Sequence, residues 1–163
     1  VSTSDRSREP VPLDALLRNV LELLEPQLRA KSITATIEGE PVIVMAQPVA
    51  LEQIVHNLVG NAMQALDTVF THELRITLSM AADGERGILS VIDNGPGIPP
   101  ESLDRVFEPF YTTREGGLGL GLSLCETLAQ SMDGRLVAAN VEPNGAAFIL
   151  SLPLAKPLQE PKP

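Results

Sequence analysis

The sequence lacks tryptophan and has few other aromatic residues, with four phenylalanines and one tyrosine among 163 residues. The core is therefore expected to be aliphatic. Basic residues are also scarce. The chain has 12 Lys and Arg and 21 Asp and Glu, which gives a net charge of −9. Nucleic-acid binders need a basic surface and, for single strands, aromatic rings that stack on bases. These two shortages argue against nucleic acid as a partner.

Cysteine and long apolar runs are scarce as well. The single cysteine, Cys125, excludes an intrachain disulfide. It falls in a leucine-rich stretch, which is typical of a buried structural thiol. No apolar run reaches the length of about 18 residues that indicates a membrane-spanning helix, and no signal peptide opens the chain. We therefore expect this piece to be a soluble, cytoplasmic domain.

Hydrophobic periodicity divides the chain into a flexible segment 1–10, one domain 11–153 and a proline-rich tail 154–163. Helical spacing predicts helices over 13–30, 48–66, 101–106 and 119–132. Alternating apolar residues predict strands over 33–37, 41–45, 76–80, 88–92, 136–139 and 147–152. The mixture has no regular βαβ alternation, so it favours an α+β fold in which helices cover one face of a mostly antiparallel sheet.

The predicted helix 48–66 carries two asparagines on its polar face. Asn57 and Asn61 are four residues apart, so both amides point the same way. Asparagine is a poor helix former, and such violations of local preference tend to mark functional sites. An amide oxygen suits Mg²⁺, which takes one or two protein oxygens beside phosphates, and Gly60 leaves room for a ligand. The alternative is a solvated face without a ligand.

A glycine-rich loop follows the apolar strand 88–92 and begins with Asp93. A carboxylate at this position can accept a hydrogen bond from an exocyclic amine such as N6 of adenine. Gly95 and Gly97 permit close backbone approach and positive φ angles. The alternative is that Asp93 only forms an Asx turn.

A second glycine-rich segment follows a short aromatic cluster at 107–111. Gly117, Gly119 and Gly121 lead into the predicted helix 119–132. Bare N–H groups at a helix N-terminus form a phosphate cradle, and Arg114 adds positive charge there. The spacing alone is weak evidence, because it is neither a Walker A motif nor the dinucleotide fingerprint.

In this order and spacing, the segments resemble the histidine-kinase branch of the GHKL superfamily of ATP-binding proteins. Residues 52–65 look like its N box, 93–97 like its first glycine box, 107–113 like its F box, 117–121 like its second glycine box and 144–148 like its final glycine turn. The resemblance covers about residues 11–153. Within that branch, the boxes look closest to those of nitrogen-regulation and C4-dicarboxylate sensors.

The resemblance implies a Bergerat-type α/β sandwich with a flexible lid over ATP. It places Asp93 on adenine N6, Asn61 on Mg²⁺, and Asn57 and Arg114 near the phosphates. The other residues that it places at the nucleotide are Gly95, Gly97, Ile98, Phe110, Thr113, Gly117, Leu118, Gly119, Leu120 and Gly121. Three positions depart from the usual pattern, since Gln64, Leu118 and Asn144 stand where many members have a basic residue, Thr and Gly.

The resemblance also implies an activity. The catalytic domain of a sensor histidine kinase transfers the γ-phosphoryl group of ATP to a histidine on a separate dimerisation domain, from which it passes to a response regulator. The parent protein is then expected to be a homodimer anchored in the inner membrane. ATPases of the superfamily carry a glutamate that activates water four residues before the Mg²⁺-binding asparagine. Asn57 stands at that position and cannot act as a base, so slow hydrolysis is expected.

Each of the two histidines, His56 and His72, has two possible roles. His72 begins a His-Glu-Leu-Arg run that imitates a phosphoacceptor motif, but a strand pattern follows it, so we predict a loop histidine. His56 lies beside Asn57 and is a candidate catalytic residue near the γ-phosphate, with a surface or interdomain contact as the alternative. Two other functions also stay open for the chain, an anti-sigma-type serine kinase and a nucleotide-sensing interaction module without transfer activity.

Overall fold

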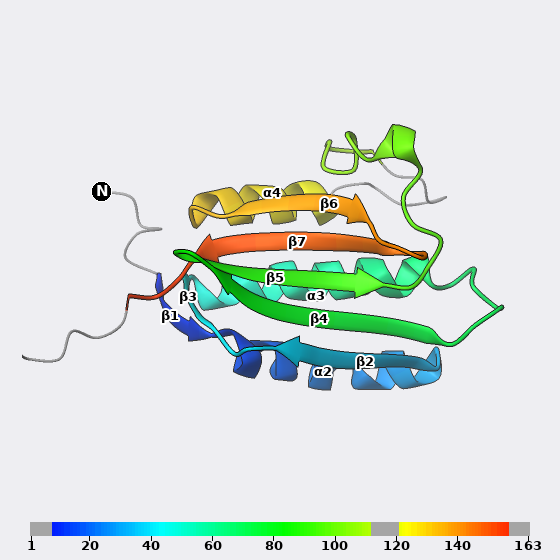
Figure 1. Cartoon of the computed structure of the whole chain (residues 1–163), viewed down its shortest axis with the longest axis horizontal. Coiled ribbons are helices and arrows are strands. Elements are labelled where there is room, and N and C mark those ends of the chain that lie inside the picture. The colour runs from blue at the N-terminus through cyan, green and yellow to red at the C-terminus, as the bar shows by residue number, and fades with distance from the viewer. Residues whose placement is uncertain (1–7, 112–120, 157–163) are drawn as a thin grey trace, which may run out of the picture.

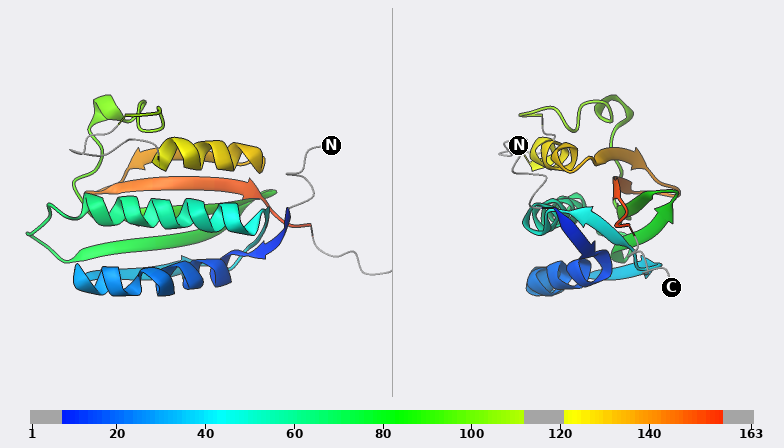
Figure 2. Two further views of the ribbon diagram at one scale, coloured as in Figure 1. Left: turned by 180° about the vertical axis from the view of Figure 1, so that it is seen from behind. Right: turned by 90° about the vertical axis from the view of Figure 1, so that its left-hand side faces the viewer.

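The computed structural model describes residues 8–111 and 121–156. A five-stranded sheet forms one layer, and the helices lie on one of its faces (Figures 1 and 2). The strand order is β2 (Ile33–Gly39), β4 (Leu74–Asp83), β5 (Arg86–Asp93), β7 (Ala146–Pro153) and β6 (Arg135–Asn140). Strands β2 and β4 are parallel, and every other neighbouring pair is antiparallel. This arrangement confirms the predicted α+β sandwich.

Helix α3 (Pro48–Ala65) lies between α2 (Leu13–Ala30) and α4 (Gly121–Ser131) on the sheet (Figure 2). It begins at Pro48, where a missing N–H is harmless, and the Gln47 side chain accepts a hydrogen bond from the Ala50 N–H. One side of α3 is fully buried against the sheet, at Leu51, Ile54, Val55, Leu58 and Val59. The other side is therefore left to carry the asparagines.

Removing a core side chain from α3 is expected to destabilise the fold strongly. Leu58 is 0% exposed, so Leu58→Ala leaves a cavity and should lower the free energy of unfolding by about 2–5 kcal/mol. Urea unfolding followed by circular dichroism measures the loss. Leu23→Ala is the matched control, because Leu23 is 73% exposed on α2 and its removal should have little effect. Equal losses in the two variants would contradict the burial of Leu58 in the core.

A second, two-stranded sheet pairs β1 (Glu9–Pro12) with β3 (Ile43–Ala46). Glu9 and Pro10 of the predicted segment 1–10 thus lie in β1, because a short edge strand with prolines has no sequence pattern that predicts its distant partner. At the other end, the Leu154 N–H donates to the Glu85 carbonyl and the Ala155 N–H donates to the Ile43 carbonyl. Hydrogen-bonded structure therefore extends beyond 11–153, and the domain boundaries stay a prediction.

Two helix predictions also need adjustment. The expected helix over 101–106 is a single 3₁₀ turn, η1 (Pro100–Ser102), followed by further turns with bonds to the third residue back. The N–H groups of Leu103, Arg105 and Glu108 donate to the third residue back rather than to the fourth, which is the 3₁₀ and not the α-helical pattern. Helix α4 begins at Gly121, and residues 119–120 of its predicted span lie outside the described part. Among the described residues, no helix is long and apolar enough to span a membrane.

Candidate functional site

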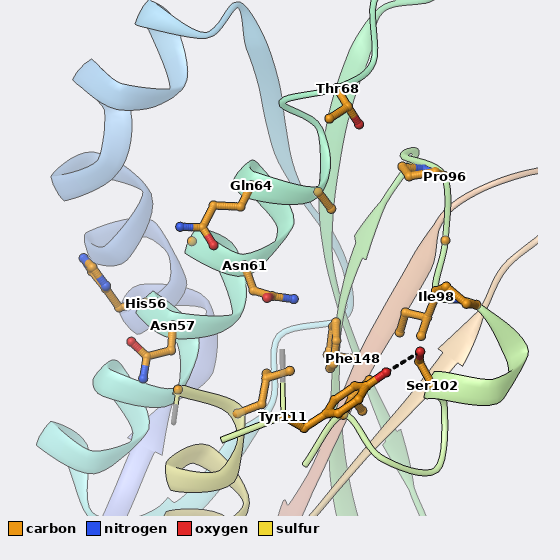
Figure 3. A pocket seen from close by; sticks show the side chains of 17 residues that line it. His56, Asn57, Asn61, Gln64, Thr68, Pro96, Ile98, Ser102, Tyr111 and Phe148 are labelled. Carbon is orange, nitrogen blue, oxygen red and sulfur yellow. Dashed lines mark hydrogen bonds between the residues drawn. The ribbon is translucent and has the colours of Figure 1, made fainter. Parts of the chain in front are cut away.

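A cavity of about 520 Å³ opens between α3, the loop after β5 and the start of α4 (Figure 3). The polar side of α3 forms one wall, through His56, Asn57, Gly60, Asn61, Gln64 and Ala65. The opposite wall comes from Pro96, Gly97, Ile98 and Pro99, together with Ser102, Val106 and Tyr111. The structure therefore joins the two predicted sites, the asparagine face and the glycine loop, in one concave site large enough for a nucleotide.

The side chains of α3 point in different directions. Asn61 extends toward the side of Ile98, whereas the side chains of His56 and Gln64, which also line the cavity, point to the other side of α3 (Figure 3). No atom outside its own helix lies within 4 Å of the position that a Cβ would take at Gly60. The predicted space for a ligand at this turn is therefore present beside the Asn61 amide.

Asn57 connects α3 to α4. Its Nδ2 donates a weak hydrogen bond to Cys125 Sγ at 3.6 Å. Cys125 is 0% exposed, and burial raises the pKa of its thiol, with the Asn57 contact opposing that rise. The sulfur is therefore neutral and unreactive, which confirms the predicted structural thiol. The contact also fixes the Asn57 amide at the junction of the two helices.

Asp93 lies beneath the glycine loop and is 3% exposed. Its Oδ1 accepts a hydrogen bond from the Gly95 N–H at 2.8 Å, so the Asx turn considered as an alternative is present. Burial raises the pKa of the Asp93 carboxyl, while hydrogen bonds from the Gly95 and Ala146 N–H groups act in the opposite direction. A carboxylate has about four acceptor positions, and these two donors leave capacity for another.

The raised pKa of Asp93 predicts a pH dependence of stability. Its ordinary pKa is 3.8 and the folded value is higher, so its contribution to the free energy of unfolding is largest below pH 3.8. The contribution is lost as the pH rises through the folded pKa. Asp93→Asn cannot titrate, so the difference in free energy of unfolding between variant and wild type should shift in favour of the variant as the pH rises through this range, by about 1.4 kcal/mol per tenfold difference in proton affinity. Urea unfolding of both proteins at several pH values measures this gain, and a pH-independent difference would contradict it.

The loop after Asp93 needs its second glycine for a conformational reason. Gly97 has a φ of +83°, and an added Cβ would lie 2.9 Å from Asn140 Oδ1. A side chain at this position would be both strained and crowded. Gly97 and Ile98 reach the cavity, whereas Asp93 and Gly95 lie below its surface and do not line it. Of the predicted loop residues, Gly97 and Ile98 therefore line the cavity, and Asp93 and Gly95 support the loop from below.

Several lining residues were not predicted. Tyr111 lines the cavity, and its hydroxyl donates a hydrogen bond to Ser102 Oγ at 2.5 Å (Figure 3). Phe148 on β7 forms part of the floor and packs edge-on against Phe107, with ring centroids 6.2 Å apart. Tyr111 belongs to the aromatic cluster at 107–111, and this cluster was the feature of the sequence that could have indicated Tyr111 as a lining residue. Phe110, chosen from that cluster instead, is 73% exposed and does not line the cavity.

The second glycine segment is only partly described. Gly121, the first residue of α4, lines the cavity together with Leu122. Thr113, Arg114, Gly117, Leu118, Gly119 and Leu120 were predicted to contact the nucleotide and lie outside the described residues. Helix α4 therefore begins beside the site that α3 and the loop after β5 form, and the phosphate cradle predicted over residues 117–121 stays a prediction.

Comparison with protein families agrees with this geometry. Residues 46–156 match the family described as histidine kinase-, DNA gyrase B- and HSP90-like ATPases. The chain belongs to this family. Within it, the chain is the ATP-binding catalytic domain of the sensor-histidine-kinase type, as its relatives indicate.

The sensor protein TorS of Escherichia coli (strain K12) is 37% identical over 159 residues, which cover 94% of this chain and 16% of TorS. The catalytic domain of histidine kinase ThkA superposes with a TM-score of 0.79 at 31% identity, covering 90% of this chain and 95% of that one. ShkA in complex with AMPPNP gives a TM-score of 0.79 at 34% identity, covering 93% of this chain and 32% of ShkA. The chain thus spans about a sixth of the length of TorS. The finer resemblance to nitrogen-regulation and C4-dicarboxylate sensors is not confirmed by these relatives.

Proposed function

We propose that this domain binds ATP with Mg²⁺ and transfers the γ-phosphoryl group to a histidine on a separate dimerisation domain. The observation that carries the proposal is the cavity itself, in which the Asn61 amide faces the glycine loop above buried Asp93. ShkA, which has the same fold, was solved with the ATP analogue AMPPNP, and this supports a nucleotide as the ligand.

Asp93 is proposed to select adenine. Its carboxylate is held by the Gly95 and Ala146 N–H groups and retains acceptor capacity for the N6 amine. A buried carboxylate that gains a hydrogen-bond donor loses part of the penalty of its burial. Adenine binding should therefore favour the ionised form of Asp93 and lower its pKa from the raised value of the nucleotide-free domain.

Asn61 is proposed to hold Mg²⁺. Among the described residues, no group of three or more His, Cys, Asp or Glu side chains gathers as a metal site. Mg²⁺ needs none, since it usually keeps several waters and takes one or two protein oxygens beside substrate phosphates. An amide oxygen on the cavity face of α3 fits this requirement. Bound there, the ion would supply neutralisation of phosphate charge.

The transfer needs positioning more than a protein base. An imidazole nitrogen of the acceptor forms a bond to the γ-phosphorus, while the bond to the bridging oxygen breaks and ADP leaves with the electron pair. Asn57 cannot activate water, so transfer to the acceptor is favoured over hydrolysis. The phosphate contacts predicted for Arg114 and for Gly117, Gly119 and Gly121 are also part of the proposal. His56 lines the cavity, but its side chain points to the other side of α3 from Asn61 (Figure 3), so a role near the γ-phosphate and a surface or interdomain contact both stay proposals.

The partners of the domain follow from the same proposal. ThkA was solved in complex with the response regulator protein TrrA, at a TM-score of 0.76 and 30% identity to this chain. A response regulator is therefore the proposed final acceptor. A homodimeric parent anchored in the inner membrane, with this domain on the cytoplasmic side, is also proposed. The comparisons do not support the serine-kinase and nucleotide-sensing alternatives.

Two measurements test the function. Calorimetric titration with ADP should show binding that weakens without Mg²⁺, and affinity weaker than about −4 kcal/mol, a Kd of about 1 mM, would contradict it. A dimerisation domain with an acceptor histidine, supplied with ATP, should then gain an acid-labile phosphoryl group. Acid-stable phosphoserine would indicate the serine kinase, and binding without any transfer would indicate a nucleotide-sensing module.

A further inference from the structure

The loop after Asp93 is fastened by side chains from the β6–β7 hairpin. Asn140, the last residue of β6, makes a two-way contact with Ile98: its Nδ2 donates to the Ile98 carbonyl at 2.8 Å, and its Oδ1 accepts from the Ile98 N–H at 2.7 Å. Asn144, in the turn, donates from Nδ2 to the Asn94 carbonyl at 2.7 Å and to the Gly95 carbonyl at 3.4 Å. Two carboxamides therefore hold both ends of the loop.

The start of the loop is also held from the opposite side. His72 Nε2 lies 2.8 Å from the Asn94 carbonyl, and the Asn94 side chain bridges the Arg75 N–H and the Glu73 carbonyl at 2.8 and 2.7 Å. These contacts place His72 in a loop before β4, as predicted. On the opposite side, next to β7, the side chains that restrain the loop are Asn140 and Asn144.

The same hairpin touches Asp93 directly. A Cβ added to Gly145 would lie 1.9 Å from the Asp93 carbonyl oxygen, so the two backbones are in close contact. The N–H groups that hold the Asp93 carboxylate belong to Gly95 and Ala146. Ala146 follows Gly145, and Gly95 follows Asn94, whose Cα would lie 3.1 Å from the same added Cβ. A shift of the hairpin relative to the loop would therefore move the carboxylate.

We propose that Asn140 and Asn144 are positioning residues that set the base selectivity of the nucleotide site. They act through the loop: Asn144 fixes the Gly95 peptide that holds Asp93, and Asn140 fixes Ile98, which lines the cavity. The inference rests on the proposed function, since it assigns Asp93 the reading of a purine amine. Sites of this kind need their groups held within about 0.5 Å of the productive geometry.

Stability and base selectivity together distinguish a positioning role of Asn140 and Asn144 from a merely structural one. Asn140 and Asn144 are both exposed, so water can replace their hydrogen bonds in a variant, and global stability should change little. The loop would then sample more positions, and nucleotide affinity would fall because the binding geometry has to be restored at each binding event. Loss of selectivity without loss of stability is therefore the signature of positioning.

The test compares ADP with inosine diphosphate, which carries a carbonyl oxygen in place of the amine. Calorimetry on the wild type, Asn140→Ala, Asn144→Gly and the double variant gives both affinities. Each single variant should bind ADP about 3- to 10-fold more weakly, the effect of one or two hydrogen bonds, and should lose part of the preference for ADP. Asn19→Ala, which removes an exposed asparagine from α2, should change neither.

Amide exchange measured by NMR adds a direct readout at Ile98. Its N–H should exchange faster in Asn140→Ala than in the wild type, because the variant lacks the acceptor oxygen. Urea unfolding of the same variants should match the wild type. The inference is overturned if the variants keep the wild-type preference for ADP, or if they lose stability with selectivity unchanged. A wild type that binds ADP without preferring it also overturns it, whereas a wild type that does not bind ADP overturns the proposed function itself.

Discussion

Asp93→Asn is expected to weaken ADP binding about 100-fold while the domain stays folded. The carboxylate accepts from the Gly95 and Ala146 N–H groups and, in the proposed complex, from the adenine amine. An asparagine of the same shape offers one carbonyl oxygen, and its NH₂ group would face one of these donors. Hydrogen bonds to charged groups contribute about 1.5–3 kcal/mol, and an unpaired buried donor adds to the loss. Calorimetry at fixed Mg²⁺ measures the change.

The matched control for this variant is Asp83→Asn. Asp83 lies at the exposed end of β4, where β4 turns into β5 and away from the cavity lining, so the same chemical change should leave ADP affinity unaltered. Thermal unfolding without nucleotide separates binding from folding. Asp93→Asn should unfold near the wild-type temperature, because losing the buried charge offsets the imperfect hydrogen bonding. Wild-type ADP affinity in a folded Asp93→Asn variant would exclude Asp93 as the adenine reader.

Asn61→Ala is expected to slow phosphoryl transfer by about 10²- to 10³-fold, the usual effect of removing one group that stabilises transition-state charge. The reason is the proposed loss of the Mg²⁺ ligand on the cavity face of α3. ADP should still bind through its base, but its affinity should no longer depend on Mg²⁺. Transfer to a supplied dimerisation domain and calorimetry with and without Mg²⁺ measure the two effects.

Gln53→Ala is the control for this second prediction, since it removes an exposed amide from the same helix outside the cavity lining. Alanine is a better helix former than either amide, so neither variant should lose stability. An Asn61→Ala domain with undiminished Mg²⁺ dependence would show that the ion is held elsewhere. Read together, the Asp93 and Asn61 variants distinguish the base end of the nucleotide from its phosphate end.

The sequence was sufficient where local patterns encode structure. The buried side of α3 follows from residues spaced at helical intervals, and Asn57 and Asn61 follow from the same wheel. The position of Asp93 follows from the end of an apolar strand, although the sequence did not show that the side chain would lie beneath the cavity. Tyr111 lines the cavity and Phe110 does not, because the φ of +68° at Phe110 belongs to a turn that periodicity does not predict; the nucleotide contact of Phe110 stays a prediction.

The sequence by itself determined the family, the two-sided helix α3 and the order of the motifs around the site, since each depends on the spacing of nearby residues. Only the tertiary structure decided the pairing of β1 with β3, the parallel pairing of β2 with β4 and the contact of Asn140 with Ile98, 42 residues away. The physical reason is that these hydrogen bonds join segments distant in sequence. Their register is set by packing of the whole sheet, and no local periodicity records it.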